Sequence, residues 1–273
     1  MPAIFAPDPR VTLARPDLAE LALEGVLAAA AYRAPQAMQC LVPASAVRAG
    51  AEETAPLIDE LAFGEVFDVL EVSGDWAWGR ARRDGVVGYA ARRDLTDEIL
   101  EPTHRVASAD ALAGRGLEQE GGVGLPLNAL VTVLETSGDF ARTARAGWMV
   151  LTDLADFHAF DAEPAAVAER FMGAPYLRGG RNRWGRAAAA LIQQALYACG
   201  RACPREADQQ QALGRAAAPE GLIRSDLVFW GGHVAMMLDA ERLIHADPAA
   251  GVTVQTLAQA SESRGGPDAV RRL

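Results

Sequence analysis

The chain has few cysteines, few aromatic residues and little positive charge. Of its 273 residues 3 are cysteine and 6% are aromatic, and 26 Lys and Arg stand against 36 Asp and Glu, a formal net charge of −10. The cysteines, Cys40, Cys199 and Cys203, are too few and odd in number for a disulfide framework. An acidic chain binds poorly to nucleic acid or to an anionic membrane, so we expect neither as a partner.

Long hydrophobic runs and secretion signals are also missing. No apolar stretch reaches the roughly 20 residues of a membrane-spanning helix. The first ten residues, MPAIFAPDPR, have no basic segment followed by an apolar one, so no secretory signal is visible and we expect a cytoplasmic location. Cys199 and Cys203 have no second pair or nearby histidine to complete four ligands, so we expect no metal and no cofactor.

The apolar content is sufficient for more than one domain, because the chain is 50% hydrophobic and 23% charged. Residues 1–16 are rich in proline and are predicted to be extended. Residues 17–32 carry apolar residues at helical spacing among alanines, which predicts one amphipathic helix. This helix packs on a later domain in the simpler interpretation and binds a partner in the alternative. We assign residues 1–36 to an N-terminal extension with this helix.

From residue 37 the pattern changes to short strands separated by turn signals, which is typical of a small barrel. The predicted strands are 38–42, 45–48, 64–72, 76–82 and 85–89. A second set of the same signals follows at 123–126, 130–135, 137–142 and 146–149. Both sets contain the motif Glu-x-Ser-Gly-Asp-aromatic-Ala, at residues 71–77 and 135–141, so the second barrel is predicted to repeat the first.

The stretch 175–194 is the most informative part of the chain. Three glycines, Gly179, Gly180 and Gly185, form a permissive loop, and residues 187–199 are a run of helix formers that ends at Gly200. A loop that enters a helix is a place where hydrolases position a nucleophile, because a helix N-terminus lowers a thiol pKa and offers N–H groups to an oxyanion.

Downstream the sequence predicts a strand at 226–230 and a hairpin of strands 234–238 and 242–246. His233 opens the first hairpin strand and His245 lies near the end of the second, so both imidazoles are expected at the same end of the hairpin. Two hydrogen-bonded core histidines are the alternative interpretation.

Together these motifs resemble the NlpC-type family of cell-wall peptidases, which are papain-like cysteine peptidases that cut γ-D-glutamyl bonds in peptidoglycan stem peptides. The family's Asp-Cys-Ser-Gly motif aligns with residues 187–190, so Ala188 occupies the nucleophile position. The resemblance implies that His233 is the general base and that His245 orients it. It rests on Tyr176-Leu177-x-Gly179-Gly180, Gly185, Leu191-Ile192-Gln193, Asp226-Leu227-Val228-Phe229-Trp230, Gly232-His233-Val234 and His245.

The two strand-rich regions resemble bacterial SH3 domains. In the first, the resemblance rests on Val47-Arg48, Gly64-Glu65, Trp76-Ala77-Trp78 and Gly88-Tyr89. In relatives such domains contact the peptidase domain and frame its cleft, which makes Tyr89 the residue most expected in a groove, although aromatic residues on barrel strands are more often core. The expected fold is α+β, with SH3-like barrels at 37–98 and 104–154 and a papain-like NlpC-type domain at 160–273.

The substitutions extend beyond the nucleophile. The resemblance assigns substrate binding to the positions of Ala187, Ala189, Ala207 and Arg178, where this chain lacks the family's usual residues. Changes at so many positions indicate a natural pseudoenzyme rather than a single trapping substitution. We expect it to bind a peptidoglycan-derived peptide or a protein partner, such as an active relative, with a preference for anionic groups near Arg178.

A working hydrolase with an unrecognised nucleophile is the alternative hypothesis, since both histidines are present. Cys199 does not supply that nucleophile, because it lies 11 residues after Ala188 (199 − 188), about 16 Å along a helix.

Overall fold

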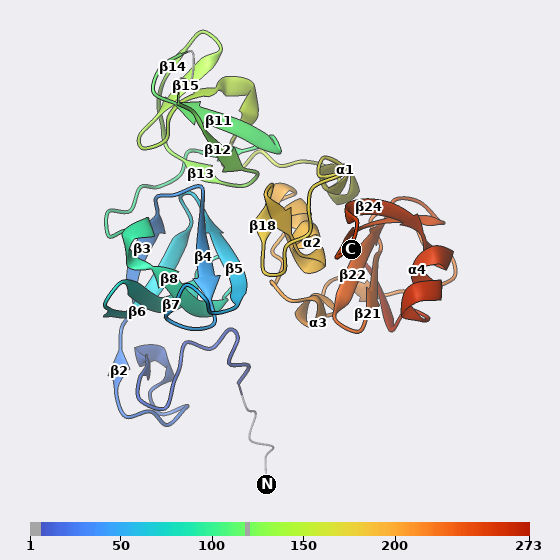
Figure 1. Ribbon diagram of the computed structural model, residues 1–273, viewed down its shortest axis with the longest axis horizontal. Coiled ribbons are helices and arrows are strands. Elements are labelled where there is room, and N and C mark those ends of the chain that lie inside the picture. The colour runs from blue at the N-terminus through green and yellow to red at the C-terminus, as the bar shows by residue number, and fades with distance from the viewer. Residues whose placement is uncertain (1–6, 118–120) are drawn as a thin grey trace. The chain divides into compact units, whose positions relative to one another are not determined.

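The computed structural model describes residues 7–117 and 121–273. Its contacts divide the chain into two compact units, Met1–Glu101 and Pro102–Leu273. The first unit holds a β barrel with an N-terminal extension, and the second holds another β barrel followed by a mixed domain of helices and strands (Figure 1). The expected α+β class, with strand-rich regions before a domain of helices and strands, is confirmed.

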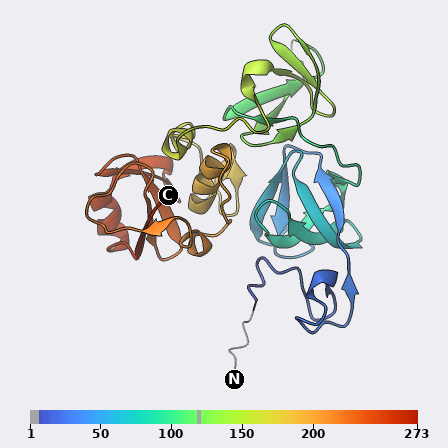
Figure 2. The same cartoon turned by 180° about the vertical axis from the view of Figure 1, so that it is seen from behind.

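The barrel of the first unit is one antiparallel sheet of seven strands in the order β5-β4-β8-β7-β6-β3-β9. It curls around a core that includes Val47 and Phe67, both fully buried (Figures 1 and 2). The strands are β3 (Gln36–Cys40), β4 (Ala44–Arg48), β5 (Leu57–Ala62), β6 (Val66–Ser73), β7 (Trp76–Ala81), β8 (Val87–Ala91) and β9 (Leu95–Thr96), with a 3-10 turn η2 (Arg92–Asp94) before the last.

The helix predicted over residues 17–32 is wrong. That stretch contains a two-residue strand β1 (Ala19–Glu20), a 3-10 turn η1 (Leu21–Leu23) and a loop, and β1 pairs with β2 (Tyr32–Arg33). The apolar residues do not share one buried face, because Leu18 is 3% exposed while Val26 is 72% exposed. Gly25 has φ +78°, a conformation that ends helices.

The second barrel repeats one hairpin of the first, although its strands form two separate sheets, of three and five strands. Its β6–β7 counterpart is the β14–β15 hairpin, and both hairpins turn at a glycine with φ +57°, Gly74 and Gly138. Both also shift register at the same distance before the turn. The repeated motif therefore marks one local structure. The strands are β10 (His104–Val106), β11 (Asp110–Gly114), β12 (Val123–Pro126), β13 (Leu130–Val131), β14 (Val133–Ser137), β15 (Phe140–Thr143), β16 (Gly147–Val150) and β17 (Leu154–Asp156), with η3 (Leu151–Asp153) before β17.

The C-terminal domain is a six-stranded antiparallel sheet in the order β20-β25-β21-β22-β23-β24, with helices on both faces. Its strands are β20 (Arg215–Ala216), β21 (Leu227–Trp230), β22 (His233–Met237), β23 (Arg242–Asp247), β24 (Gly251–Thr256) and β25 (Ala269–Arg272), and a small hairpin of β18 (Arg181–Asn182) and β19 (Gly185–Arg186) precedes it. The helices are α1 (Pro164–Glu169), α2 (Ala188–Ala198), α3 (Ala207–Gln210) and α4 (Leu257–Arg264).

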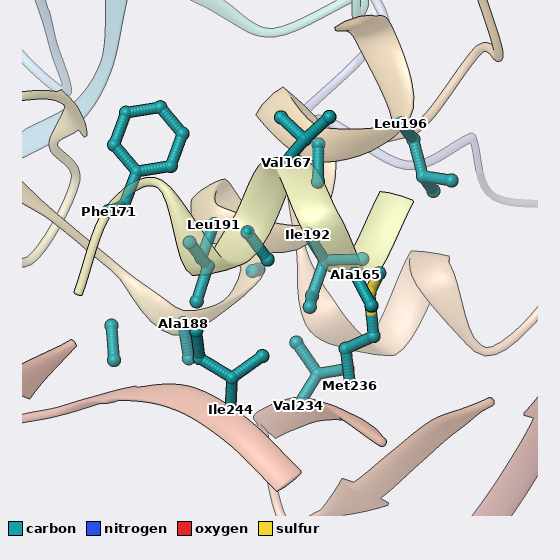
Figure 3. Packing of buried hydrophobic residues seen from close by; sticks show 14 of the residues in the cluster. Ala165, Val167, Phe171, Ala188, Leu191, Ile192, Leu196, Val234, Met236 and Ile244 are labelled. Atoms are coloured by element: carbon teal, nitrogen blue, oxygen red, sulfur yellow. The ribbon is translucent and has the colours of Figure 1, made fainter. Parts of the chain in front are cut away.

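Side-chain alternation in the sheet creates two cores. Val234 and Met236 of β22 and Ile244 of β23 pack against α1 and α2 (Figure 3). Ala235 and Met237 face the opposite side, where Ala260 of α4 lies. The sheet is therefore buried on both faces, which explains the continuous apolar runs of its central strands.

The second barrel is joined to α2 by buried contacts. Leu127, at the end of β12, belongs to the core that α2 forms with the sheet. Next to it, the buried Asn128 donates from Nδ2 to the Gln194 carbonyl oxygen at 2.9 Å and to Gln194 Oε1 at 3.0 Å. These contacts explain why the barrel and the C-terminal domain form one unit.

Candidate functional site

The loop before α2 turns back tightly because two of its positions are glycine. A Cβ on Gly185 would lie 2.4 Å from Leu177 Cβ, and a Cβ on Gly180 would lie 2.4 Å from the Gly185 carbonyl oxygen, so no larger residue fits. The Ala187 N–H then donates to the Gly180 carbonyl oxygen at 2.9 Å. These contacts fix the point where the helix begins.

Helix α2 begins without a side-chain cap. Ala187, the residue before it, has an extended backbone and a methyl group that accepts no hydrogen bond, and the first turn holds no acidic residue. Ala188 and Ala189 follow, each 7% exposed. A helix start favours thiolate or oxyanion chemistry. A methyl group, however, is not a nucleophile, so this turn carries no group that could form a covalent intermediate.

Ala207, the other predicted substrate-binding alanine, lies at the start of α3 and is 4% exposed. It packs in the same core as the first turn of α2. One turn later, Gln210 donates from Nε2 to the carbonyl oxygens of Ala189 and Pro204, both at 2.9 Å. The structure thus brings α3 against the start of α2 through apolar packing and a buried amide.

The two histidines predicted for the site lie together. His233 Nε2 is 2.9 Å from His245 Nδ1, and the rings meet edge to face with centroids 5.1 Å apart. His245 is 1% exposed. Their neighbours Val234 and Ala246 pack against α2, so alternation directs the imidazoles to the other side of their strands, with Ala235.

Both imidazoles are neutral near pH 7. Burial lowers the pKa of His233 to about 3, with smaller contributions from the positive charge of Arg264 and from the neighbouring His245, against the opposing effect of Asp247. Burial and Arg264 also lower the pKa of His245. Arg264, at the end of α4, is itself held by Asp247 at 2.9 Å. One neutral ring therefore donates its N–H to the other.

The described interactions of the imidazoles join them to each other and not to the first turn of α2, although both strands pack against that helix. Tyr89 lies on β8 of the first unit, where it packs beside Trp78 and its hydroxyl accepts a hydrogen bond from Arg15 at 3.1 Å. A groove role for Tyr89 stays a prediction.

Arg178 and Cys199 lie on other elements than the histidine pair. Arg178 is exposed on the loop before β18. Cys199 ends α2 at the opposite end from Ala188, and burial together with Asp161 and Glu163 raises the pKa of its thiol to about 11. Such a thiol is un-ionised near pH 7, which agrees with its exclusion as a nucleophile.

Sequence reasoning missed several buried arginines, two of them in the loop before α2. Arg181, Arg186 and Arg205 are 4%, 1% and 2% exposed. The guanidinium carbon of Arg186 lies 3.5 Å from the ring centroid of Phe171, which ties the loop to the end of α1. Residues 175–187 contain four arginines and no acidic residue, and this excess of positive charge could have indicated Arg181 and Arg186. Of the four, only Arg178 was considered in the sequence analysis.

A search of the described residues finds no group of three His, Cys, Asp or Glu side chains that could hold a metal ion. Within the same ranges, no helix is both long enough and apolar enough to span a membrane.

Comparison with known families agrees with this geometry. Residues 173–264 match the model of the NlpC/P60 family, and residues 47–95 match the bacterial dipeptidyl-peptidase SH3 domain. The C-terminal domain is therefore an NlpC/P60 domain, preceded by a bacterial SH3 domain, as the sequence motifs predicted. None of the curated proteins matches the chain.

Several solved structures are similar to this chain, and the first of them shares its fold. The crystal structure of an NlpC/P60 family protein from Bacillus cereus ATCC 10987 matches 86% of this chain and 99% of its own, with 18% identity and a TM-score of 0.77. The NlpC/P60 domain of the peptidoglycan hydrolase SagA is 26% identical and matches 40% of this chain and 96% of its own, with a TM-score of 0.37. The peptidoglycan hydrolase RipB from Mycobacterium tuberculosis is 26% identical and matches 40% of this chain and 62% of its own, with a TM-score of 0.36.

Proposed function

We propose that this protein is a catalytically inactive relative of the bacterial γ-D-glutamyl-L-diamino acid endopeptidases that act on peptidoglycan stem peptides, and that it has a binding or regulatory role. The observation that carries the proposal is the first turn of α2, where Ala188 to Ala190 offer only methyl groups. The covalent route of cysteine peptidases needs a thiolate at that turn. Without it, only binding and fixed dipoles remain, and these retain a small fraction of catalysis.

The test is hydrolysis of L-Ala-γ-D-Glu-diamino acid peptides by the purified chain, followed by chromatography of the products. We expect no turnover above that of a matched His233→Ala variant. Turnover by the unmodified chain that disappears in the His233→Ala variant would overturn the proposal, since it would require a working base beside a nucleophile.

An active hydrolase with an unrecognised nucleophile is the second candidate. The observation that favours it is the pair His233 and His245, whose ring nitrogens are 2.9 Å apart. A neutral imidazole held by a second one can accept a proton, but a pKa of about 3 makes His233 a weak base and counts against this candidate. Depletion of the stem peptide, with loss on His233→Ala, is the outcome that selects this candidate.

For the ligand we propose an anionic group, from a peptidoglycan-derived peptide or from an acidic side chain of a partner such as an active relative. Arg178 is exposed on the loop that enters α2 and supplies positive charge. The helix start has no side-chain cap and adds N–H groups with positive potential. An Arg178 that only points to solvent is the competing interpretation.

This ligand preference is testable by titrating an acidic dipeptide, or phosphate, while following the His233 and His245 resonances by NMR. We expect shifts in the unmodified chain that an Arg178→Ala variant loses and an Arg183→Ala variant, from the same loop, retains. Absence of any shift at millimolar ligand, or equal shifts in the Arg178→Ala variant, would remove the basis for an anion site.

A cytoplasmic location is part of the proposal. Cys40, Cys199 and Cys203 are all free thiols, and unpaired cysteines are typical of a reducing compartment.

A further inference from the structure

Positive charge is concentrated in one segment of the C-terminal domain. Residues 170–205 contain seven arginines and no acidic residue, although the whole chain has 36 Asp and Glu against 26 Lys and Arg. Because the net charge of the chain is −10, the residues outside this segment carry −17 (−10 − 7). The chain has no lysine, so each cation of the segment is a guanidinium, which pairs with a carboxylate through two parallel hydrogen bonds.

The β18–β19 hairpin, which lies beside α2, presents part of this charge at its tip (Figure 1). Asn182 pairs with Gly185 across the hairpin, so Arg183 and Trp184 form a two-residue turn. The Trp184 N–H donates to Asn182 Oδ1 at 2.7 Å, which closes the turn. The guanidinium carbon of Arg183 lies 5.9 Å from the ring centroid of Trp184, so a cation and an indole stand together at the tip.

The base of the hairpin is buried. Arg181 and Arg186 face each other across the two strands and are 4% and 1% exposed. Arg186 lies over the ring of Phe171, and the backbone of Gly185 packs against Leu177. A tip on a buried base is already ordered before a partner arrives, which lowers the entropic cost of binding.

Four side chains at and beside the tip are exposed, and we call them the tip surface: Leu177, Arg178, Arg183 and Trp184. Trp184 is 49% exposed and Leu177 is 40% exposed. Of the five tryptophans of the chain, all within the described residues, Trp184 is the only exposed one. Tryptophan and arginine are the residues that most often carry the binding energy of a protein interface. The tip surface therefore has the composition of a docking site.

We propose that the tip surface docks an acidic segment of a partner protein in which an apolar side chain lies between carboxylates. The carboxylates pair with Arg178 and Arg183, and the apolar side chain packs on Trp184 and Leu177. Charge favours this partner over a nucleic acid, because the −17 carried outside the segment repels a long polyanion, whereas a short acidic segment meets only the local excess of arginine. The inference rests on the binding role proposed above only through Arg178, and it involves neither the histidines nor the first turn of α2.

The experiment uses the full chain and the peptide acetyl-Glu-Glu-Leu-Glu-Glu-amide. The Trp184 indole N–H is followed by NMR during the titration and is assigned by its absence in a Trp184→Phe variant. We expect saturable binding at least about fivefold tighter than that of the matching Gln peptide, since only the carboxylates pair with guanidinium groups. The binding should weaken between about 50 and about 200 mM salt, because charges at the surface are screened.

Variants at exposed positions separate the tip surface from positive charge in general, with the polarisation of a fluorescein-labelled peptide as the measure. Arg183→Ala should weaken peptide binding at least about fivefold, and Arg183→Lys should restore only part of it, because an ammonium group does not form the bidentate pair. Trp184→Ala should also weaken binding, through loss of the apolar contact. Arg201→Ala is the matched control and should bind like the unmodified chain, since Arg201 is exposed and belongs to the same basic segment but follows the other end of α2.

Three results would overturn the proposal. The first is an unchanged affinity in Arg183→Ala, and the second is tighter binding of a single-stranded oligonucleotide of the same charge than of the acidic peptide. The third is self-association at low salt that Arg183→Ala abolishes, without any response to the peptide, since this would assign the surface to a second copy of the chain.

The same NMR titration keeps this inference separate from the anion site proposed at the start of α2. A shift of the Trp184 indole with unmoved His233 and His245 resonances supports the tip surface and counts against the anion site. Shifts of the histidine resonances without a shift of Trp184 overturn the tip surface and leave the anion site in place.

Discussion

The two sides of the candidate site in the C-terminal domain have retained different features. On the helix side, the glycine loop and the buried face of α2 are present, but its first turn holds only methyl groups. On the strand side, His233 and His245 remain hydrogen-bonded on β22 and β23. The difference shows that the fold of this site needs the loop and the core, and does not need the reactive group.

The reason is physical. Gly180 and Gly185 are required because an added Cβ would lie 2.4 Å from the Gly185 carbonyl oxygen and from Leu177 Cβ, respectively, so any side chain there disturbs the fold. Ala188 packs in the apolar core, where a methyl group is as compatible with helix formation as a thiol. The histidines are costlier to bury if charged, and their lowered pKa values keep them neutral.

If the helix side and the strand side support the fold equally, truncating a core residue on either side should lower the free energy of unfolding. This is the largest effect that we expect. Leu191 of α2 and Ile244 of β23 are both fully buried in the core they share. We expect Leu191→Ala and Ile244→Ala each to lower the free energy of unfolding by about 2–5 kcal/mol, from lost burial and the cavity that remains.

Urea unfolding of the full chain, fitted to the transition of the second unit, measures this. Leu134→Ala is the matched control, because Leu134 is 54% exposed and should change stability by less than about 0.5 kcal/mol. A Leu191→Ala chain as stable as the control would show that the helix side no longer supports the fold.

The pH dependence of stability tests the strand side. The pKa of His233 is lowered to about 3 in the folded chain, while the unfolded chain titrates near 6.5. Between these values the unfolded chain binds more protons, so stability falls as pH drops from about 6.5 toward 3, by at most about 4 kcal/mol for this residue.

Thermal unfolding of the unmodified chain and of His233→Gln, between pH 7.5 and 4, isolates this contribution from that of the carboxylates. We expect a shallower loss of stability in the variant. Parallel curves for the two proteins would mean that His233 is not buried in its neutral form.

Much of this domain was predictable because its signals are local. The glycine loop, the alanine-rich helix and the apolar strand 226–230 each follow from a few adjacent residues. Other features could not be predicted from the adjacent sequence, because they depend on contacts with distant parts of the chain. β5 was missed because the acidic Asp59 and Glu60 interrupt its apolar pattern, yet both are buried. The false helix over 17–32 arose because alanine spacing does not reveal that Leu18 is used by the barrel.

The candidate site was likewise predictable only in part. The proximity of His233 and His245 followed from their positions in one hairpin. The role of Arg264 could not be anticipated, because it reaches the histidines from α4, a helix 19 residues further along the chain (264 − 245). Arg15 is farther still from Glu71, with which it pairs, at 56 residues along the chain (71 − 15).

Removing the positive charge of Arg264 beside the histidines should have a smaller effect, which we expect in the pKa values of the two imidazoles. Burial is the main cause of the low pKa of His233, and Arg264 is the next. Arg264→Met should therefore raise the pKa of both imidazoles, by up to about one unit. NMR titration of the ring protons measures it, with Arg242→Met as the control, since Arg242 pairs with the exposed Asp239. A fall in either pKa would contradict the assigned role of Arg264.

The smallest effect on activity is expected from Ala188→Cys. A thiol at the start of α2 should have a lowered pKa, while burial raises the pKa of Cys40 to about 12 and that of Cys199 to about 11. Iodoacetamide near neutral pH should therefore label the variant at residue 188 and leave Cys40 and Cys199 unmodified, as mass spectrometry can show. Cys199, at the other end of α2, serves as the internal control.

The Ala188→Cys variant should nevertheless hydrolyse the stem peptide at a rate close to background. Ala187, Ala189 and Ala207, the positions to which the resemblance assigns substrate binding, still carry only methyl groups, and an unaligned nucleophile gains little from its reactivity. A thiol that is alkylated but does not turn over substrate is the result that supports loss of the whole helix side. Efficient hydrolysis after this single change would instead mean that the helix side lacks only the sulfur atom at residue 188. The remaining alanines would then be compatible with substrate binding.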